Sequence, residues 1–272
     1  MLSASCCSGM GVATLATAVF LSMSSLPSAG AETLGEVDLA LVIAVDISSS
    51  MDLDEQHLQR KGYAEALRSR LVLEAISRGA RGRIAVSYME WADKTDQRVV
   101  VPWQIIEGPE TADAFVQRLD ADPPRRGIKT SISAGIDYSV RLLEDAPVTA
   151  MRRVIDVSGD GANNQGRAVT SARDDAVAKG IAINGLPIML KRPGYMDIEN
   201  LDYYYEDCVI GGSGAFIVPA RERSQFAEAI RKKLFLEVAA PALKSFLKPA
   251  RARQRVPCDA GERLSKEPWK PW

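Results

Sequence analysis

The sequence has only one histidine, His57, among its 272 residues, and it lacks the short motifs of several enzyme classes. A serine hydrolase needs a base beside its nucleophile, but His57 falls on the surface of an expected helix. The nearest approach to a nucleophile elbow, Gly-Gly-Ser-Gly-Ala at 211–215, has alanine in place of the last glycine. The sequence also contains no Gly-x-x-x-x-Gly-Lys-Ser/Thr run, which excludes a P-loop.

The spacing of the acidic residues supports no other enzyme class. Asp46 ends the first apolar run, as the nucleophile of a haloacid dehalogenase-type phosphatase does, but Ser48 stands where those enzymes need a second aspartate. No spacing singles out a pair of carboxylates for glycoside hydrolysis. We therefore do not expect an enzyme, and a hydrolase is the less favoured alternative.

Neither sign of charge is in excess. The chain has 34 Lys and Arg against 35 Asp and Glu, a net charge of −1, which argues against a general nucleic-acid binder. Residues 241–272 differ, with eight basic residues, three acidic residues and five prolines. Because proline breaks regular structure, we expect an irregular basic tail there.

The first 31 residues contain no Lys, Arg, Asp or Glu. They have an apolar centre at 12–21 and end in Ala29-Gly30-Ala31, which is an A-x-A cleavage pattern. We interpret 1–31 as a secretory signal peptide, although its start lacks the usual basic residue, and we expect a periplasmic or secreted protein. An uncleaved membrane anchor is the alternative, for which the apolar centre is short.

Cysteine is scarce, and signal cleavage would leave only Cys208 and Cys258. In an oxidising compartment, an even pair is a candidate disulfide. That bridge would fasten the C-terminal tail to the body of the domain. The alternative is two buried free thiols.

The run at 37–45 is apolar except for Asp38, is rich in Val, and ends in Asp46. Such a run, too short to span a membrane, is typical of a strand buried on both faces of a parallel sheet. Open α/β sheets bind ligands beyond the carboxyl ends of their strands. We therefore expect the functional residues near Asp46.

Helical and extended patterns alternate after this strand. We expect helices over 53–77, 109–119, 132–143, 167–179 and 226–234, and strands over 83–91, 98–106, 151–157, 181–190 and 215–218. The polar link 93–97 predicts an antiparallel hairpin at one sheet edge. The whole pattern predicts an α/β fold over 36–240, with a doubly wound, mostly parallel six-stranded sheet and one antiparallel edge strand.

Five oxygen-bearing side chains come from three loops that should meet at the carboxyl edge of this sheet. They are Asp46, Ser48, Ser50, Thr130 and Asp160. Carboxylates and hydroxyls suit Mg²⁺ or Mn²⁺ rather than zinc, which prefers nitrogen and sulfur. For the first three, the alternative is that the serines cap the next helix while Asp46 accepts hydrogen bonds from backbone amides.

Asp46-x-Ser48-x-Ser50, the lone Thr130 and the Asp160-Gly161 pair resemble the metal-ion-dependent adhesion site of von Willebrand factor type A domains. The signal peptide, the segment 208–212 and the closing helix further resemble an uncharacterised group of secreted bacterial proteins built on this domain. The resemblance implies that the three hydroxyls coordinate the cation and that both aspartates act directly or through water. It also implies that a partner carboxylate completes the coordination.

Arg125 and Arg126, before Thr130, are candidate rim residues for an acidic partner, as is Asn163 near Asp160. The alternatives are solvated arginines and a simple turn. The expected function is divalent-cation-dependent binding of a protein ligand in the cell envelope. The alternative is a metal-independent assembly scaffold for an envelope complex.

Overall fold

The computed structural model describes residues 1, 33–194, 197–243 and 255–266. The predicted signal peptide therefore lies outside the described residues except for Met1, as does part of the predicted tail. The compact unit is Thr33–Trp272. Its elements are β1 (Glu36–Asp46), α1 (Leu53–Arg68), α2 (Arg70–Ser77), β2 (Ile84–Trp91), β3 (Gln97–Ile106), α3 (Pro109–Ala121), α4 (Ile132–Glu144), β4 (Thr149–Gly159), α5 (Val169–Ala178), β5 (Ile181–Pro187), α6 (Leu201–Tyr204), the π-helix η1 (Tyr205–Val209), the 3-10 turn η2 (Arg223–Gln225), α7 (Phe226–Leu243) and α8 (Ala260–Leu264).

β1 is the central strand of a five-stranded sheet with the order β3-β2-β1-β4-β5. It pairs in parallel with both β2 and β4, and β5 continues the parallel ladder beyond β4. The odd-numbered residues from Leu39 to Val45 join one core cluster, and the even-numbered residues from Ala40 to Ala44 join the other. Side chains alternate between the two faces of a strand, so this apolar run supplies both cores.

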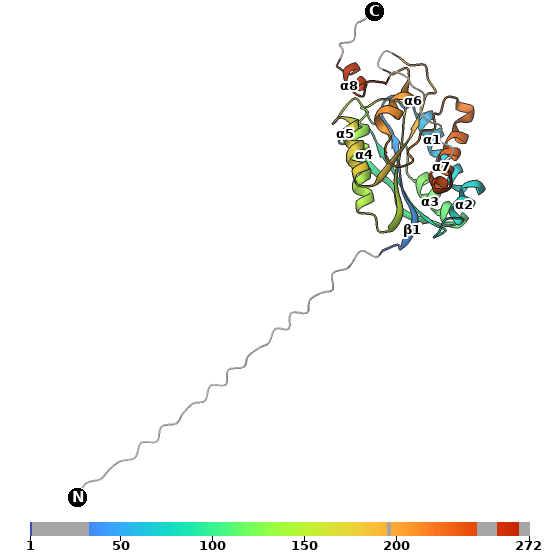
Figure 1. Cartoon of the computed structure of the whole chain (residues 1–272), viewed down its shortest axis with the longest axis vertical. Helices are drawn as coiled ribbons and strands as arrows, with labels where there is room; N and C mark the ends of the chain where they lie inside the picture. Colours follow the sequence, from blue (N-terminus) through green and yellow to red (C-terminus); the bar gives the residue numbers. More distant parts are fainter. Residues whose placement is uncertain (2–32, 195–196, 244–254, 267–272) are drawn as a thin grey trace, which may run out of the picture. The chain divides into compact units, whose positions relative to one another are not determined.

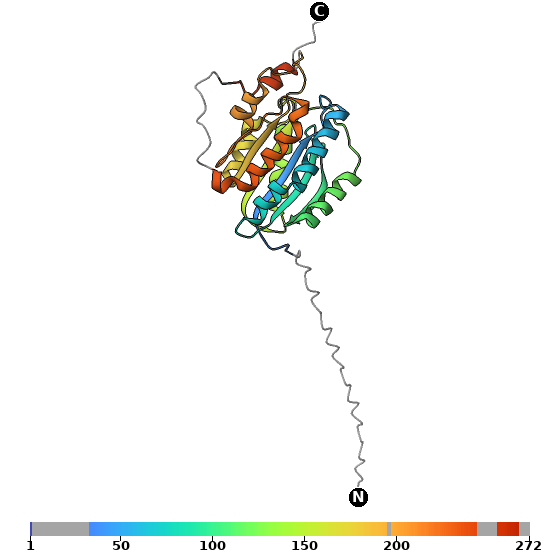
Figure 2. The same ribbon diagram turned by 90° about the vertical axis from the view of Figure 1, so that its right-hand side faces the viewer.

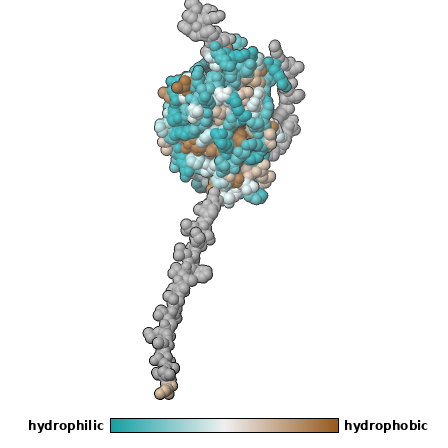
Figure 3. Space-filling model, turned by 90° about the vertical axis from the view of Figure 1, so that its left-hand side faces the viewer, coloured by the Kyte–Doolittle hydropathy of each residue, from teal (hydrophilic) through white to brown (hydrophobic). Residues whose placement is uncertain are grey.

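Helices cover both faces of the sheet (Figures 1 and 2). α1, α2, α3 and α7 contribute to the first cluster, and α4 and α5 contribute to the second. Figure 3 shows a largely hydrophilic outer surface in which apolar side chains form small, separate patches. The chain continues from β1 to β2 on one side and places β4 on the other, so the strand order reverses at β1. The carboxyl ends of β1 and β4 therefore flank the position where such sheets bind ligands.

The predicted fold class is confirmed, but the sheet has five strands rather than six. The segment 215–220 lies along the free side of β5 and makes only isolated bridges there, Gly185 with Ile217 and Ile188 with Ala220. Val218 N and Ala220 N donate to Gly185 O and Pro187 O at 3.0 and 2.9 Å, but Pro187 has no backbone N–H to donate in return, which interrupts the ladder. The predicted edge hairpin is present, because β3 pairs antiparallel with β2 at the border of the sheet.

The helix predicted over 53–77 is broken at Ser69. This residue has extended backbone angles, φ −69° and ψ 138°, and its side chain accepts a hydrogen bond from Val72 N to begin α2. A serine hydroxyl can replace the helical hydrogen bonds of a neighbouring amide, and apolar periodicity does not reveal that competition. Among the described residues, no helix is long and apolar enough to cross a lipid bilayer.

The expected irregular tail contains a short helix. α7 continues to Leu243, and α8 occupies Ala260–Leu264 within the part of the tail that is described. The disulfide between Cys208 and Cys258 is formed, and it joins residues 50 positions apart in the sequence. The prediction that this bridge fastens the tail to the domain is therefore confirmed.

Candidate metal site

The end of β1 and the loop after it carry the first three of the predicted oxygen-bearing side chains. Asp46 is fully buried at the end of the strand, and its Oδ1 accepts a hydrogen bond from the backbone N–H of Ser48 at 2.7 Å. The hydroxyls of Ser48 and Ser50 lie 3.0 Å apart. Alternate residues of this loop thus place three side-chain oxygens together.

The capping alternative is wrong for the serines. Asp52 caps α1, because its Oδ1 accepts from Glu55 N at 2.8 Å while the Glu55 carboxylate accepts from Asp52 N at 3.0 Å. The hydroxyls of Ser48 and Ser50 are thereby left for another role. For Asp46 the alternative is half right, since one of its oxygens does accept from a backbone amide.

Thr130 and Asp160 come from two other loops and meet the β1 loop. The hydroxyl of Ser50 donates to Oδ1 of Asp160 at 2.5 Å. A Cβ on Gly161 would lie 3.6 Å from Oγ1 of Thr130 and 4.0 Å from Oγ of Ser50, so all three loops are in contact. The structure therefore brings the five predicted side chains to one edge of the sheet.

Backbone contacts hold these loops together. Thr130 N donates to Oδ1 of Asn164 at 3.0 Å, and Asn164 N donates to Thr130 O at 2.8 Å. Gly127 N donates to Ile47 O at 2.7 Å, and a Cβ on Gly127 would lie only 2.0 Å from Cβ of Ala92. Only glycine permits that close approach.

The residues present fit a hard divalent cation. Oδ2 of Asp46 is buried and makes no hydrogen bond with the described residues. A Cβ on Gly159 would lie 2.7 Å from this atom, so the absent side chain leaves room for the carboxylate. A buried carboxylate oxygen is costly unless it is paired or bound to a cation. Three hydroxyls beside two carboxylates form the kind of oxygen set that Mg²⁺ binds.

The carboxyl groups of Asp46 and Asp160 both have a raised pKa. Burial, followed by the nearby Asp160 carboxylate, raises the pKa of Asp46 well above its ordinary value. Burial also raises the pKa of Asp160, to about 6. Among the described residues, no three His, Cys, Asp or Glu side chains are placed to hold a metal. A cation here would therefore depend on the hydroxyls.

The acidity of Asp160 predicts how stability varies with pH. Its folded-state pKa of about 6 lies above its ordinary 3.8, so its stabilising contribution is present at low pH and is lost as pH rises through the folded value. With chelator present, the free energy of unfolding should fall between about pH 4 and pH 7 relative to that of Asp160→Asn. Urea titrations of both proteins at each pH would measure this difference. Parallel curves would contradict it.

The three predicted rim residues, Arg125, Arg126 and Asn163, differ in their exposure and in their contacts. Arg126 is exposed and donates to Ser49 O at 2.8 Å, beside the site. Arg125 instead faces Asp96 at 3.0 Å and Glu90 at 3.5 Å, within an internal group of ion pairs. Asn163 is fully buried, so its side chain does not lie on the rim. Its side-chain amide hydrogen-bonds to Ser133 N in α4 and to Glu262 in α8, which sequence position alone did not reveal.

Lys191 was missed by the sequence reasoning. Its Nζ donates to Ser50 O at 2.6 Å and also pairs with the carboxylate of Glu55. A cavity of about 390 Å³ lies here, and Ser50, Asp160 and Lys191 are among the residues that line it. The only signal in the sequence was the position of Lys191 beyond the carboxyl end of a parallel strand.

The comparisons with known proteins give a family and a fold. A family model described as "Protein of unknown function (DUF1194)" matches residues 36–242. No curated protein matches the sequence.

Three solved structures share the fold. They are the pilus adhesin SpaC from Lactobacillus rhamnosus GG (TM-score 0.56, 12% identity, 74% of this chain and 30% of that chain), a von Willebrand factor type A structure from Catenulispora acidiphila (0.50, 13%, 74% and 43%) and proximal thread matrix protein 1 from the mussel byssus with a zinc-occupied MIDAS motif (0.51, 12%, 74% and 46%). The chain spans less than half of each of these structures. Its fold is that of von Willebrand factor type A domains.

Proposed function

The chain belongs to the DUF1194 family of proteins of unknown function, and we propose that it binds a protein partner through a divalent cation at the carboxyl edge of its sheet. The observation that carries this proposal is the convergence of five side-chain oxygens from three loops around a buried carboxylate. Oδ2 of Asp46 makes no hydrogen bond with the described residues, and Ser50 and Asp160 contact each other beside it.

The hydroxyls of Ser48, Ser50 and Thr130 would hold the cation with the carboxylates of Asp46 and Asp160. Mg²⁺ or Mn²⁺ suits these ligands. A bound cation supplies a positive centre that attracts an anionic group. If one of the two carboxylates acts through bound water instead of directly, the positive charge is only partly cancelled at the open coordination position, so a partner that presents an Asp or Glu side chain fits best. Arg126 adds positive charge beside the site.

Two of the solved structures support this proposal, because one is a pilus adhesin and another carries zinc in its MIDAS motif. The Cys208–Cys258 disulfide supports an exported protein, because disulfides persist in oxidising compartments. We place the protein in the periplasm or outside the cell, and we assign it no enzymatic activity.

Calorimetric titration tests the proposal. Mg²⁺ and then Mn²⁺ are added to metal-stripped protein from Glu32 to Trp272, the predicted mature form, and we expect saturable binding to one site. Ser50→Ala and Thr130→Ala should each weaken binding about tenfold or more, because a polar group facing a charge contributes about 1.5 to 3 kcal/mol.

Ser49→Ala is the matched control. Its hydroxyl belongs to the same loop but donates to Ile128 O instead, so its cation affinity should equal that of the unmutated protein. Absence of binding by the unmutated protein would contradict the proposal. Partner capture that persists in chelator would favour the metal-independent scaffold.

A further inference from the structure

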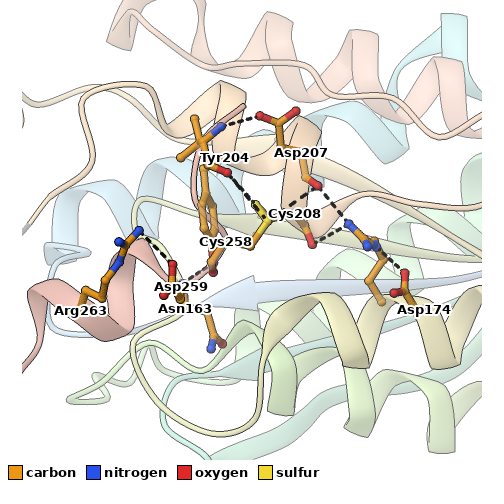
Figure 4. The surroundings of a disulfide bond; sticks show 10 residues. Asn163, Asp174, Tyr204, Asp207, Cys208, Cys258, Asp259 and Arg263 are labelled. Atoms are coloured by element: carbon orange, nitrogen blue, oxygen red, sulfur yellow. Dashed lines mark hydrogen bonds and ion pairs between the residues drawn. A yellow bond between two sulfur atoms is a disulfide. The ribbon is translucent and has the colours of Figure 1, made fainter. Parts of the chain in front are cut away.

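The C-terminal strap, residues 255–266, lies beyond the part of the chain that the family model matches. It is attached covalently through the Cys208–Cys258 disulfide. Next to the bridge, Val256 N donates to Oδ2 of Asp207 at 2.9 Å. Figure 4 shows this anchor with Asn163 and Tyr204 close to the bridge. The strap is thus fixed near one end, and farther along it Glu262 and Ser265 contact the loop that carries Asp160.

The strap contacts the Asp160 loop at Asn163. Oε1 of Glu262 accepts a hydrogen bond from Nδ2 of Asn163 at 2.7 Å. The preceding residue, Gly261, is buried, and a Cβ on it would lie 2.2 Å from Asn163 O and 3.0 Å from Cβ of Ala162. Backbone therefore packs directly on backbone here, which only glycine allows.

Asn163 and its neighbour Asn164 connect the strap to the candidate site through hydrogen bonds. Its Oδ1 accepts from Ser133 N at 3.0 Å in the first turn of α4, and its own N–H donates to the Tyr204 hydroxyl at 3.2 Å. The next residue, Asn164, bonds Thr130 through both its side chain and its backbone. One stretch, 160–164, thus joins Asp160, Thr130 and the strap.

We propose that Glu262 and Gly261 are positioning residues for the cation site, an inference that rests on the proposed function above. By holding Asn163, they fix the 160–164 loop so that Asp160 and Thr130 face the β1 loop. Within the part of the chain that the structure describes, neither strap residue hydrogen-bonds to any of the five predicted ligands. Their effect is on how well those ligands are preorganised, as it is for residues that orient metal ligands in other proteins.

The test compares Glu262→Ala, Glu262→Gln and Arg263→Ala in the otherwise intact mature chain. Mn²⁺ affinity is measured by calorimetry, and thermal unfolding is measured in chelator. Glu262→Ala should weaken Mn²⁺ binding about tenfold or more, while Glu262→Gln, which keeps the acceptor oxygen, restores it. Arg263 is exposed and pairs only with Asp259 among the described residues, so Arg263→Ala should match the unmutated protein.

Amide hydrogen exchange of 160–164 in chelator gives a readout that does not depend on the cation. We expect faster exchange in Glu262→Ala and no change in Arg263→Ala or Glu262→Gln. Unchanged exchange in Glu262→Ala would overturn the strap's role, as would an affinity loss that Arg263→Ala shares. If the unmutated protein binds no Mn²⁺, the proposed function fails, and the exchange result still decides whether the strap holds the loop.

Discussion

Replacing Asp46 with alanine should abolish saturable Mg²⁺ and Mn²⁺ binding while leaving the protein folded. Asp46 supplies a fully buried carboxylate whose Oδ2 makes no hydrogen bond with the described residues. Without that negative charge, three of the four remaining ligands, Ser48, Ser50 and Thr130, are neutral hydroxyls, which compensate poorly for the water that a small cation must lose. The measurement is the calorimetric titration described above.

The fold should survive because β1 is held by apolar burial on both faces, not by the ion. Burial raises the pKa of Asp46, so the charged carboxylate is a cost to the cation-free protein rather than a support. Asp46→Asn should therefore equal or exceed the unmutated protein in free energy of unfolding when chelator is present. Asp54→Asn, an exposed change of the same charge on α1, is the control and should keep cation binding. Loss of the folded circular-dichroism spectrum in Asp46→Ala, or normal binding by Asp46→Asn, would contradict this account.

Replacing Lys233 with methionine should destabilise the protein by about 3 to 5 kcal/mol, because it leaves buried carboxylates without their cation. Nζ of Lys233 in α7 lies 2.5 Å from Oδ1 of Asp156 in β4 and 2.6 Å from Oε1 of Glu237. All three side chains are at most 1% exposed. The contact between Lys233 and Asp156 ties α7 to the centre of the sheet.

Chemical denaturation in chelator measures this effect apart from the candidate cation site. The matched control is Lys233→Met combined with Asp156→Asn and Glu237→Gln. Removing all of the charges should recover much of the lost stability, since a buried ion pair often contributes little beyond what uncharged side chains of the same size provide. Tyr63 would still donate to residue 156, as it does to Oδ2 of Asp156 at 3.2 Å in the protein. A loss below about 1 kcal/mol for Lys233→Met would indicate that water reaches the cluster.

The burial of Lys233 could not be predicted from the local sequence pattern. The spacing of Phe226, Ile230 and Leu234 predicts α7, and all three are buried. The same spacing gives no reason to bury Lys233, which is as buried as its apolar neighbours. Its partner Asp156 lies in β4, and only the packing of α7 on the sheet brings the two charges together so that Lys233 can be buried.

The sequence by itself determined the central strand, the doubly wound α/β fold and the five oxygens that follow three of its loops. These follow from short-range rules: apolar periodicity, side-chain alternation along a strand, and the meeting of parallel strand ends at one edge. The tertiary structure decided what depends on distant partners. Asn163 turns away from the rim because Glu262, 99 residues later, accepts its amide hydrogen. Lys191 reaches the β1 loop because Ser50, 141 residues earlier, offers its carbonyl oxygen. The direction of a polar side chain depends on which group forms its hydrogen bond. When that group is far away in the sequence, only the folded chain brings it within hydrogen-bonding distance.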